Sequence, residues 1–334
     1  MNSMNSTTSM INKKASKPVI ANIIWPFSVL IGGGLNSISA SVDGNNVVVV
    51  GSAQAPGTLA VVLTSSDLGR TFVSGTQNLL CTKVTISGAR VVVIGKLTSS
   101  GPNKYWLSSD YGVTFTMSPT TTSPAIGDAR GRISMSGANA VRGDYFGNIV
   151  YSSNYGQDWS LGRIVPGNAS YGSWWDVFIY GTRAIACQYT GRPASGMYYS
   201  SNSGQTWTKS TSAAANKDGF VACAMFGQYA VATTFVYGNY QGIIYSSDYG
   251  VTWSNSLINT AQYLYFDGSI CINNTSAYAL TSFPAGYVYS NNNGATWNYS
   301  TTSTQGMMEI SISGDQLFAP IYGSNILTIG TKPF

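Results

Sequence analysis

Carboxylates are the side chains of this sequence best suited to acid–base chemistry, because the chain contains no histidine and a single glutamate. A general acid and a general base acting as a carboxylate pair are the minimum that glycoside hydrolysis requires. The candidates for such a pair are Asp128, Asp144, Asp176, Asp218 and Glu309. A tyrosine nucleophile cannot be singled out, since the chain has 22 tyrosines.

Four cysteines could in principle bind a metal or form disulfides. Cys81, Cys187, Cys223 and Cys271 fall in expected strands and show no C-x-x-C spacing. Zinc sites usually combine cysteine with histidine or use paired cysteines, and neither is available here. We therefore expect buried free thiols, no metal site and no cofactor.

Six segments share the pattern Ser-x-Asp/Asn-x-Gly-x-Thr-Trp/Phe, with Asp158 in place of Thr in the third copy. They are SSDLGRTF (65–72), SSDYGVTF (108–115), SSNYGQDW (152–159), SSNSGQTW (200–207), SSDYGVTW (246–253) and SNNNGATW (290–297). Successive motif glycines lie 43 to 48 residues apart. Self-similarity with this period indicates a repeat architecture, with propeller blades as the first candidate.

The residue types of these repeat motifs predict tight turns. Asp or Asn can bind nearby backbone N–H groups, Gly allows a positive φ, and the aromatic residue anchors the next strand. Calcium loops use similar spacing, but three copies carry Asn and none has a nearby bidentate Glu, so we expect metal-free structural turns. The residues assigned to them are Asp67, Gly69, Asp110, Gly112, Asn154, Gly156, Asn202, Gly204, Asp248, Gly250, Asn292 and Gly294.

The repeat motif resembles the Asp-box (BNR) repeat of sialidases and many other β-propellers. The resemblance covers nearly the whole chain and implies a propeller fold. It implies no single function, because the repeat occurs in hydrolases, lectins, receptors and assembly factors. A sialidase would carry an arginine triad and a Tyr–Glu pair, whereas no arginine precedes Arg70 and Glu309 is the only glutamate.

The segments between the motifs predict the number of blades. A pair of short apolar runs joined by a Gly/Asn/Asp turn precedes each motif, and a seventh pair (309–323) follows the last one. Each blade then has four strands, A to D, with the motif between C and D. We expect an all-β, seven-bladed propeller of four-stranded antiparallel blades, closed by pairing of an N-terminal strand (18–29) beside 325–330.

Composition and charge limit the partners and the domain organisation. Charged residues make up 9% of the chain and the net charge is +5, without a Lys/Arg cluster, so no nucleic-acid partner is expected. The apolar run 19–31 contains Pro26 and is too short for a membrane span, so we assign it to the closing strand. We expect residues 1–17 to form a polar arm, for which a partner chain or a larger assembly is a possible binding partner, and 18–334 to form one propeller domain.

Antiparallel order places the A–B turns and the repeat motifs on one face, and the longer B–C and D–A loops on the other. Variable loops on a rigid scaffold usually carry binding sites, so we expect a glycan or protein partner on the loop face. Charged and aromatic residues that suit a polyol concentrate in blades three and four. The predicted ligand-binding residues are Arg142, Asp144, Tyr145, Arg163, Trp174, Asp176, Tyr189 and Arg192.

Three functions remain open from the sequence. A glycan-binding or attachment module on a surface or virion-like assembly fits the Asn-, Ser-, Thr-, Gly- and Tyr-rich, charge-poor composition and would show a concave mouth lined by Arg and aromatic residues. A scaffold subunit would show extensive contacts by residues 1–17. A glycosidase would show two carboxyl groups facing each other across the mouth. We expect the first, without catalysis.

Overall fold

The computed structural model describes residues 24–30, 35–53, 62–74, 79–96, 103–119, 132–144, 146–165, 173–188, 195–216, 219–234, 242–260, 262–266, 269–301, 307, 309–320 and 326–331. Within these ranges the chain is built from strands, apart from one short 3₁₀ helix, η1 (Ala213–Asn216). None of the described helical structure is long or apolar enough to cross a membrane. The predicted arm, residues 1–17, lies outside the described residues.

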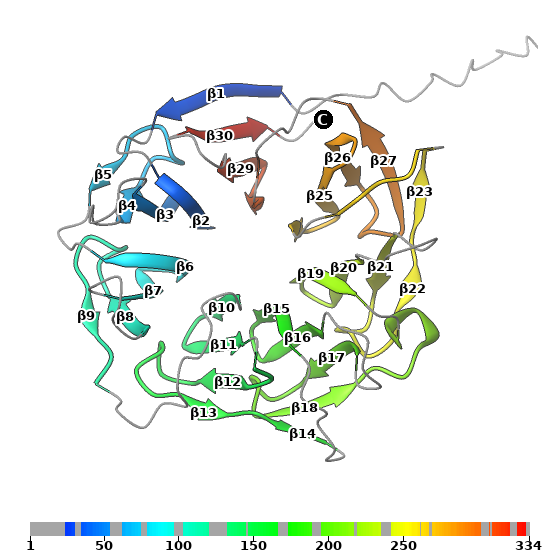
Figure 1. Cartoon of the computed structure of the whole chain (residues 1–334), viewed down its shortest axis with the longest axis horizontal. Helices are drawn as coiled ribbons and strands as arrows, with labels where there is room; N and C mark the ends of the chain where they lie inside the picture. Colours follow the sequence, from blue (N-terminus) through cyan, green and yellow to red (C-terminus); the bar gives the residue numbers. More distant parts are fainter. Residues whose placement is uncertain are drawn as a thin grey trace, which may run out of the picture.

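The described strands form seven sheets arranged around a central axis (Figure 1). Sheet 1 comprises β2 (Leu35–Asp43), β3 (Asn46–Ala53), β4 (Val62–Ser65) and β5 (Val73–Ser74). Sheet 2 comprises β6 (Leu80–Ser87), β7 (Arg90–Lys96), β8 (Lys104–Ser108) and β9 (Thr116–Met117). Sheet 3 comprises β10 (Ile133–Ser136), β11 (Asn139–Gly143), β12 (Ile149–Ser152) and β13 (Ser160–Leu161). Sheet 4 contains β15 (Trp174–Tyr180), β16 (Arg183–Gln188), β17 (Gly196–Ser200) and β18 (Thr206–Lys209). Sheet 5 contains β19 (Phe220–Phe226), β20 (Tyr229–Thr234), β21 (Gly242–Ser246) and β22 (Ser254–Asn255). Sheet 6 contains β24 (Ile270–Asn273), β25 (Ser276–Ser282), β26 (Ala285–Ser290) and β27 (Thr296–Ser300). Sheet 7 contains β28 (Ser311–Ser313), β29 (Gln316–Pro320), β30 (Ile326–Thr331) and β1 (Ile24–Leu30).

The N-terminal strand completes the last sheet, as the sequence predicts. β1 pairs antiparallel with β30, so sheet 7 contains strands from both ends of the described chain. Sheet 7 is also joined to sheet 1 by the Glu309 carboxylate, which accepts a hydrogen bond from Ala40 N at 3.2 Å. Ser313 Oγ donates to the carbonyl of Gly44 at 2.9 Å, also between these two sheets.

Two sheets differ from the expected four antiparallel strands. β14 (Arg163–Ile164) runs parallel to β18 on the outer edge of sheet 4, and β23 (Leu257–Asn259) does the same beside β27 of sheet 6. In each case the chain leaving one sheet runs along the outside of the next before it turns inward. This fifth strand covers an outer edge that would otherwise leave backbone groups unpaired.

The middle strands are buried on both faces because every sheet is packed between two neighbours. Runs such as Val47–Val50 and Val91–Ile94 are therefore continuous rather than alternating. The four cysteines are free and buried, as expected.

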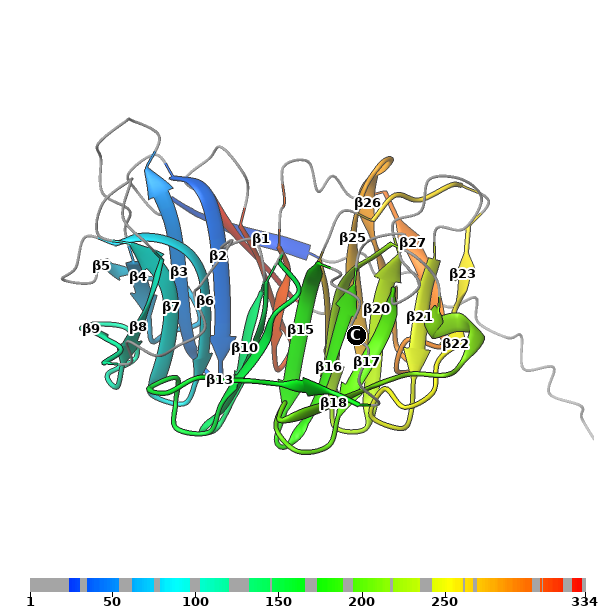
Figure 2. The same cartoon turned by 60° about the horizontal axis from the view of Figure 1, so that its bottom comes forward.

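The two innermost strands of each sheet are joined by a turn that contains one residue with φ between 53° and 61°. These turn residues are Gly44, Gly88, Gly137, Gly181, Gly227, Asn274 and Gly314. They lie along one face of the molecule, which we call the turn face, and the opposite ends of the inner strands lie at the other face (Figure 2). We call the latter the loop face.

The repeat motifs are turns that satisfy their own polar groups. In the fifth copy, Asp248 Oδ1 accepts hydrogen bonds from Ser246 Oγ (2.7 Å) and Thr252 N (2.9 Å), and Asp248 Oδ2 accepts one from Thr252 Oγ1 (2.6 Å). Ser246 Oγ in turn accepts from Gly250 N at 2.9 Å. In the third copy, Asn154 stands at the Asp position and Asp158 at the Thr position. Asn154 Nδ2 donates to Asp158 Oδ2 at 2.7 Å, so the two side chains still hydrogen-bond across the turn.

The motif glycine also serves as a contact between sheets, which the sequence did not predict. A Cβ on Gly250 would lie 2.5 Å from Ile185 Cγ2, and one on Gly294 would lie 2.4 Å from Val231 Cγ1, each on the preceding sheet. The residue before the glycine also has a positive φ, for example 63° at Tyr249. The turns of the second to sixth copies therefore pack their backbone directly against the preceding sheet.

Candidate functional site

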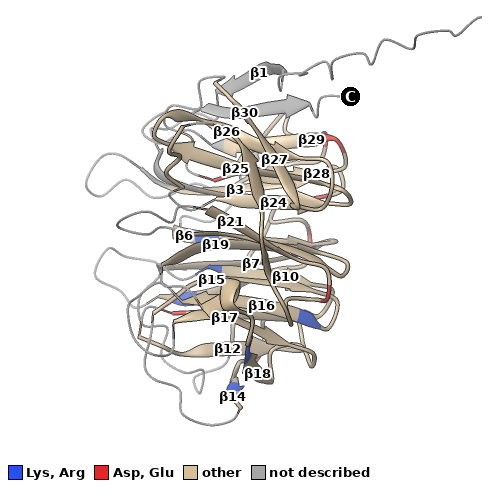
Figure 3. Ribbon diagram, turned by 90° about the vertical axis from the view of Figure 1, so that its right-hand side faces the viewer, with Lys and Arg blue, Asp and Glu red and all other residues tan. Residues whose placement is uncertain are grey.

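Charged residues are sparse in the described part of the chain (Figure 3). Four of them line the loop-face end of the central cavity. Lys83, Arg132, Asp176 and Glu309 line this end of a cavity of about 190 Å³. Below them the lining becomes apolar, with Ile86, Met135, Phe178, Ile272 and Ile312. A second hollow of about 270 Å³ opens towards the turn face.

The four charged residues occupy one position of the structural repeat. Each lies five residues before the positive-φ residue of its inner turn, on the innermost strand or one or two residues before it. We call this set the inner ring; its members are Ser39, Lys83, Arg132, Asp176, Ala222, Ser269 and Glu309. A register shift in the strand pairing directly precedes Lys83, Asp176 and Ala222, and such bulges redirect the side chains that follow them.

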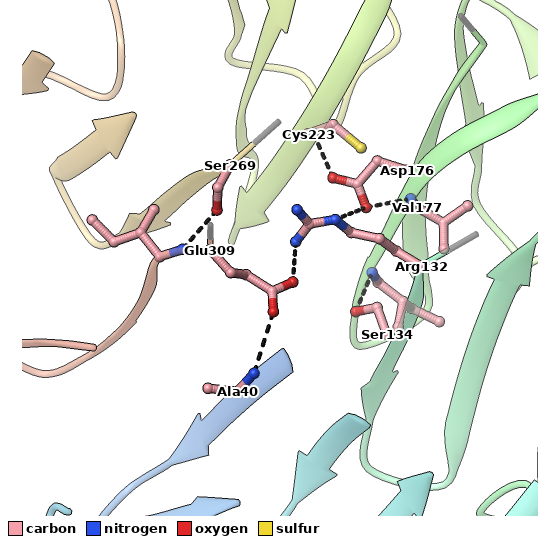
Figure 4. A network of polar contacts seen from close by, with 10 residues as sticks. Ala40, Arg132, Ser134, Asp176, Val177, Cys223, Ser269 and Glu309 are labelled. Carbon is pink, nitrogen blue, oxygen red and sulfur yellow. Dashed lines mark hydrogen bonds and ion pairs between the residues drawn. The ribbon is translucent and has the colours of Figure 1, made fainter. Parts of the chain in front are cut away.

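Arg132 connects three sheets across the cavity (Figure 4). Its Nη1 atom donates to Glu309 Oε1 of sheet 7 in a short contact, and its Nε atom lies 3.6 Å from Asp176 Oδ1 of sheet 4. The guanidinium thus lies between the two carboxylates. Because the four charges cancel, the inner ring is neutral overall when all are ionised.

Backbone groups of adjacent sheets hold the acceptor side chains of the inner ring. Asp176 Oδ2 accepts a hydrogen bond from Cys223 N at 2.9 Å, and Asp176 Oδ1 accepts one from Val177 N at 2.9 Å. Ser269 Oγ accepts from Ile310 N at 2.7 Å. Asp176 and Ser269, like Glu309, therefore link one sheet to the next.

The two carboxylates have pKa values shifted in opposite directions. Burial raises the pKa of Asp176 to about 6, although Arg132 and the two backbone hydrogen bonds favour its ionised form. Burial alone would also raise the pKa of Glu309, but the charges of Arg132 and Lys83, with hydrogen bonds from Ser39 and Ala40, lower it. Glu309 is therefore the more strongly ionised of the pair.

Lys83 differs from the other charged members because it has no hydrogen bond or ion pair with any described residue. Burial lowers the pKa of its ammonium, and the charge of Glu309 only partly offsets this. The side chain lines the cavity and is half-buried. An ammonium withdrawn from water in this way is stabilised by any oxygen acceptor brought to it.

The residues predicted to bind ligand do not form one cluster. Asp176 belongs to the inner ring and is 4% exposed, and the side chains of Arg142, Asp144 and Trp174 are likewise buried. Asp144 Oδ1 accepts hydrogen bonds from the backbone N–H groups of Phe146 and Asn148, at 2.9 and 2.8 Å.

Trp174 Nε1 donates to the carbonyl of Gly147 at 2.9 Å, and its ring packs edge-on against Tyr198. Arg163 is exposed on β14, at the outer edge of sheet 4. Tyr145, Tyr189 and Arg192 lie outside the described residues, so ligand binding by the set stays a prediction.

Sequence reasoning missed Lys83 and Arg132 and treated Glu309 only as a possible catalytic acid. Aligning the seven hairpins on their turn residues would have placed all three at the same repeat position as Asp176. No group of three or more His, Cys, Asp or Glu residues that could hold a metal occurs in the described part of the chain.

No family model matches the sequence, and no curated protein matches it. Solved structures do match. YCF48 bound to D1 peptide superposes with a TM-score of 0.63 at 14% identity, covering 92% of this chain and 97% of that one. YCF48 from Cyanidioschyzon merolae gives a TM-score of 0.60 at 16% identity, with 91% and 98% covered.

The GH74 enzyme of Niastella koreensis gives a TM-score of 0.59 at 16% identity, covering 86% of this chain. The GH74 xyloglucanase of Xanthomonas campestris gives 0.60 at 12% identity, covering 90%. This chain spans 50% and 53% of those two chains, about half their length. At these identities the matches show a shared propeller-type fold, in enzymes and in YCF48 alike, and leave the activity of this chain open.

Proposed function

We propose that this chain is a non-catalytic, seven-bladed Asp-box propeller that binds a glycan on its loop face, as an attachment module of a surface or virion-like assembly. The seven sheets and the motif turns support the fold assignment. The observation that carries the binding proposal is Lys83, a cavity-lining ammonium without an ion-pair or hydrogen-bond partner among the described residues.

The chemistry of the inner ring suits a ligand rich in oxygen atoms. A hydroxyl or carboxylate oxygen of a sugar could accept a hydrogen bond from Lys83 without displacing the Arg132 ion pairs. Typical pockets for drug-sized ligands measure about 300–1,000 Å³. The cavity of about 190 Å³ would therefore admit one group of a glycan, while the remaining sugars rest on the loop face.

Glycoside hydrolysis is the second candidate, favoured by the two carboxylates that face each other at the cavity end with oppositely shifted pKa values. The geometry argues for binding without turnover. Arg132 contacts both carboxylates, and each is fixed by backbone N–H groups. With a pKa of about 6, Asp176 would be about 90% ionised at pH 7 and unsuited to donating a proton.

A glycan array followed by calorimetric titration tests the proposal. Lys83→Ala should weaken binding of the best array glycan by at least about 10-fold, because one charge-assisted hydrogen bond is lost. Arg90→Ala removes the same charge near the turn face and should leave affinity unchanged. The proposal is overturned if no glycan binds, which favours the scaffold function, or if Lys83→Ala binds as wild type does.

Mass spectrometry of the recovered glycan separates the two candidates. An intact glycan after prolonged incubation agrees with a binding module. Cleavage that is lost in Asp176→Asn would identify a glycosidase instead.

A further inference from the structure

Three exposed aromatic side chains lie on two segments of sheet 6 that pair with each other through Tyr265 and Phe283. Tyr263, Tyr265 and Phe283 are 79%, 40% and 69% exposed. Phe283 follows β25 directly, at the end remote from the inner turn at Asn274, which places it on the loop face. We call these three residues the aromatic patch. Exposed large apolar side chains gathered in one place usually mark a binding surface.

The backbone holds the aromatic patch in a fixed arrangement. Tyr265 N donates to the carbonyl of Phe283 at 2.9 Å, and Ser282 N donates to the carbonyl of Tyr265 at 2.9 Å. The rings of Tyr265 and Phe283 lie 6.1 Å apart, edge to face. Leu264 and Phe266, which flank Tyr265, are buried, at 4% and 1% exposure, and anchor the segment from below. The patch is therefore presented outward by a well-packed support.

The described segments that carry the patch contain no charged residue. Neither 257–266 nor 281–287 contains Asp, Glu, Lys or Arg. The exposed polar residues of these segments carry amides and hydroxyls, among them Asn259 and Gln262. Neutral rings with amide partners complement an uncharged polyol, whose C–H face stacks on aromatic carbon while its hydroxyls bond to amides. These described segments offer no charged side chain to pair with a charged partner.

We propose that the aromatic patch is a second carbohydrate site, which binds a neutral hexose ring by stacking on Tyr263 and Phe283. It rests on the proposed function in taking a glycan as ligand, but it uses none of the inner-ring residues. Two sites on one face would let a branched or extended glycan bind at both, which raises the effective local concentration of the second sugar.

Titration of the full chain with two neutral oligosaccharides, maltohexaose and cellohexaose, tests this inference. At least one should bind, and Tyr263→Ala should weaken it by about 10-fold or more. Tyr263→Phe keeps the ring and should bind within about 3-fold of wild type. Tyr111→Ala removes an exposed ring from a repeat motif on the turn face and should have no effect.

The outcomes separate this inference from the proposed function. Neutral binding that is lost in Tyr263→Ala and retained in Lys83→Ala supports the patch, whatever the cavity does. Binding of neither oligosaccharide, or binding indifferent to Tyr263→Ala, overturns the inference and leaves the cavity site standing. Self-association of wild type that Tyr263→Ala abolishes would also overturn it, because the patch would then be an interface between copies.

Discussion

Replacing Gly250 with alanine should destabilise the protein strongly, because the change acts in two ways at once. The backbone at Gly250 has φ of +84°, and an L-residue in the left-handed region costs about 1–2 kcal/mol. The added Cβ would also lie 2.5 Å from Ile185 Cγ2 and 3.4 Å from Trp253 Cζ2. Ile185 is fully buried, so it cannot move aside, and overpacking typically costs about 1–3 kcal/mol. The expected total is about 2–5 kcal/mol.

Gly227→Ala is the matched control. This glycine has φ of +57° in an inner turn, with no atom within 4 Å of the added Cβ. It should cost about 1–2 kcal/mol, the conformational part alone. Urea denaturation followed by tryptophan fluorescence measures both variants, and the free energies of unfolding should differ by about 1–3 kcal/mol. Equal losses in the two variants would refute the claim that the motif glycine packs one sheet against the next.

Two further predictions concern the inner ring and the motif aromatic. Because the folded-state pKa of Asp176 is raised from 3.8 to about 6, its contribution to stability is fully present below about pH 4 and is lost as the pH rises through about 6. The loss amounts to about 3 kcal/mol, and denaturation across pH 4–7 should show a flatter profile for Asp176→Asn; profiles of equal slope would contradict the assignment. Trp253→Phe removes the hydrogen bond from Nε1 to the carbonyl of Gly250 (2.9 Å) and should cost about 1 kcal/mol, whereas an unchanged denaturation midpoint would show that this bond contributes nothing.

Much of the fold could be predicted because the repeat is written into local sequence. The turn chemistry of the six motifs and the unpaired strand-like ends were enough to predict the pairing of β1 with β30. The parallel strands β14 and β23 were missed because residues such as Arg163 and Leu257 carry no apolar alternation of their own and pair only once the next sheet is in place.

The site was harder to predict, since charge and aromaticity along the sequence do not reveal which way a side chain points. Arg142 and Trp174 lie on strands whose faces are covered by neighbouring sheets. The charged and aromatic residues that cluster in this part of the sequence are therefore partly buried, and do not all line a surface site. Lys83 and Arg132 are not part of a charged or aromatic cluster in the sequence. Only their shared position in the structural repeat indicates that they face the cavity. Register relative to the inner turn was the signal that sequence reasoning left unused.

The central claim, that the loop end of the cavity binds a glycan without cleaving it, is tested most directly by a crystal structure of the protein with its best array glycan. The account predicts an intact glycan on the loop face, with an oxygen atom within hydrogen-bonding distance of Lys83 Nζ and the Arg132 ion pairs preserved. A glycan bound on the turn face or on the outer strands, or a cleaved product between Asp176 and Glu309, would contradict it.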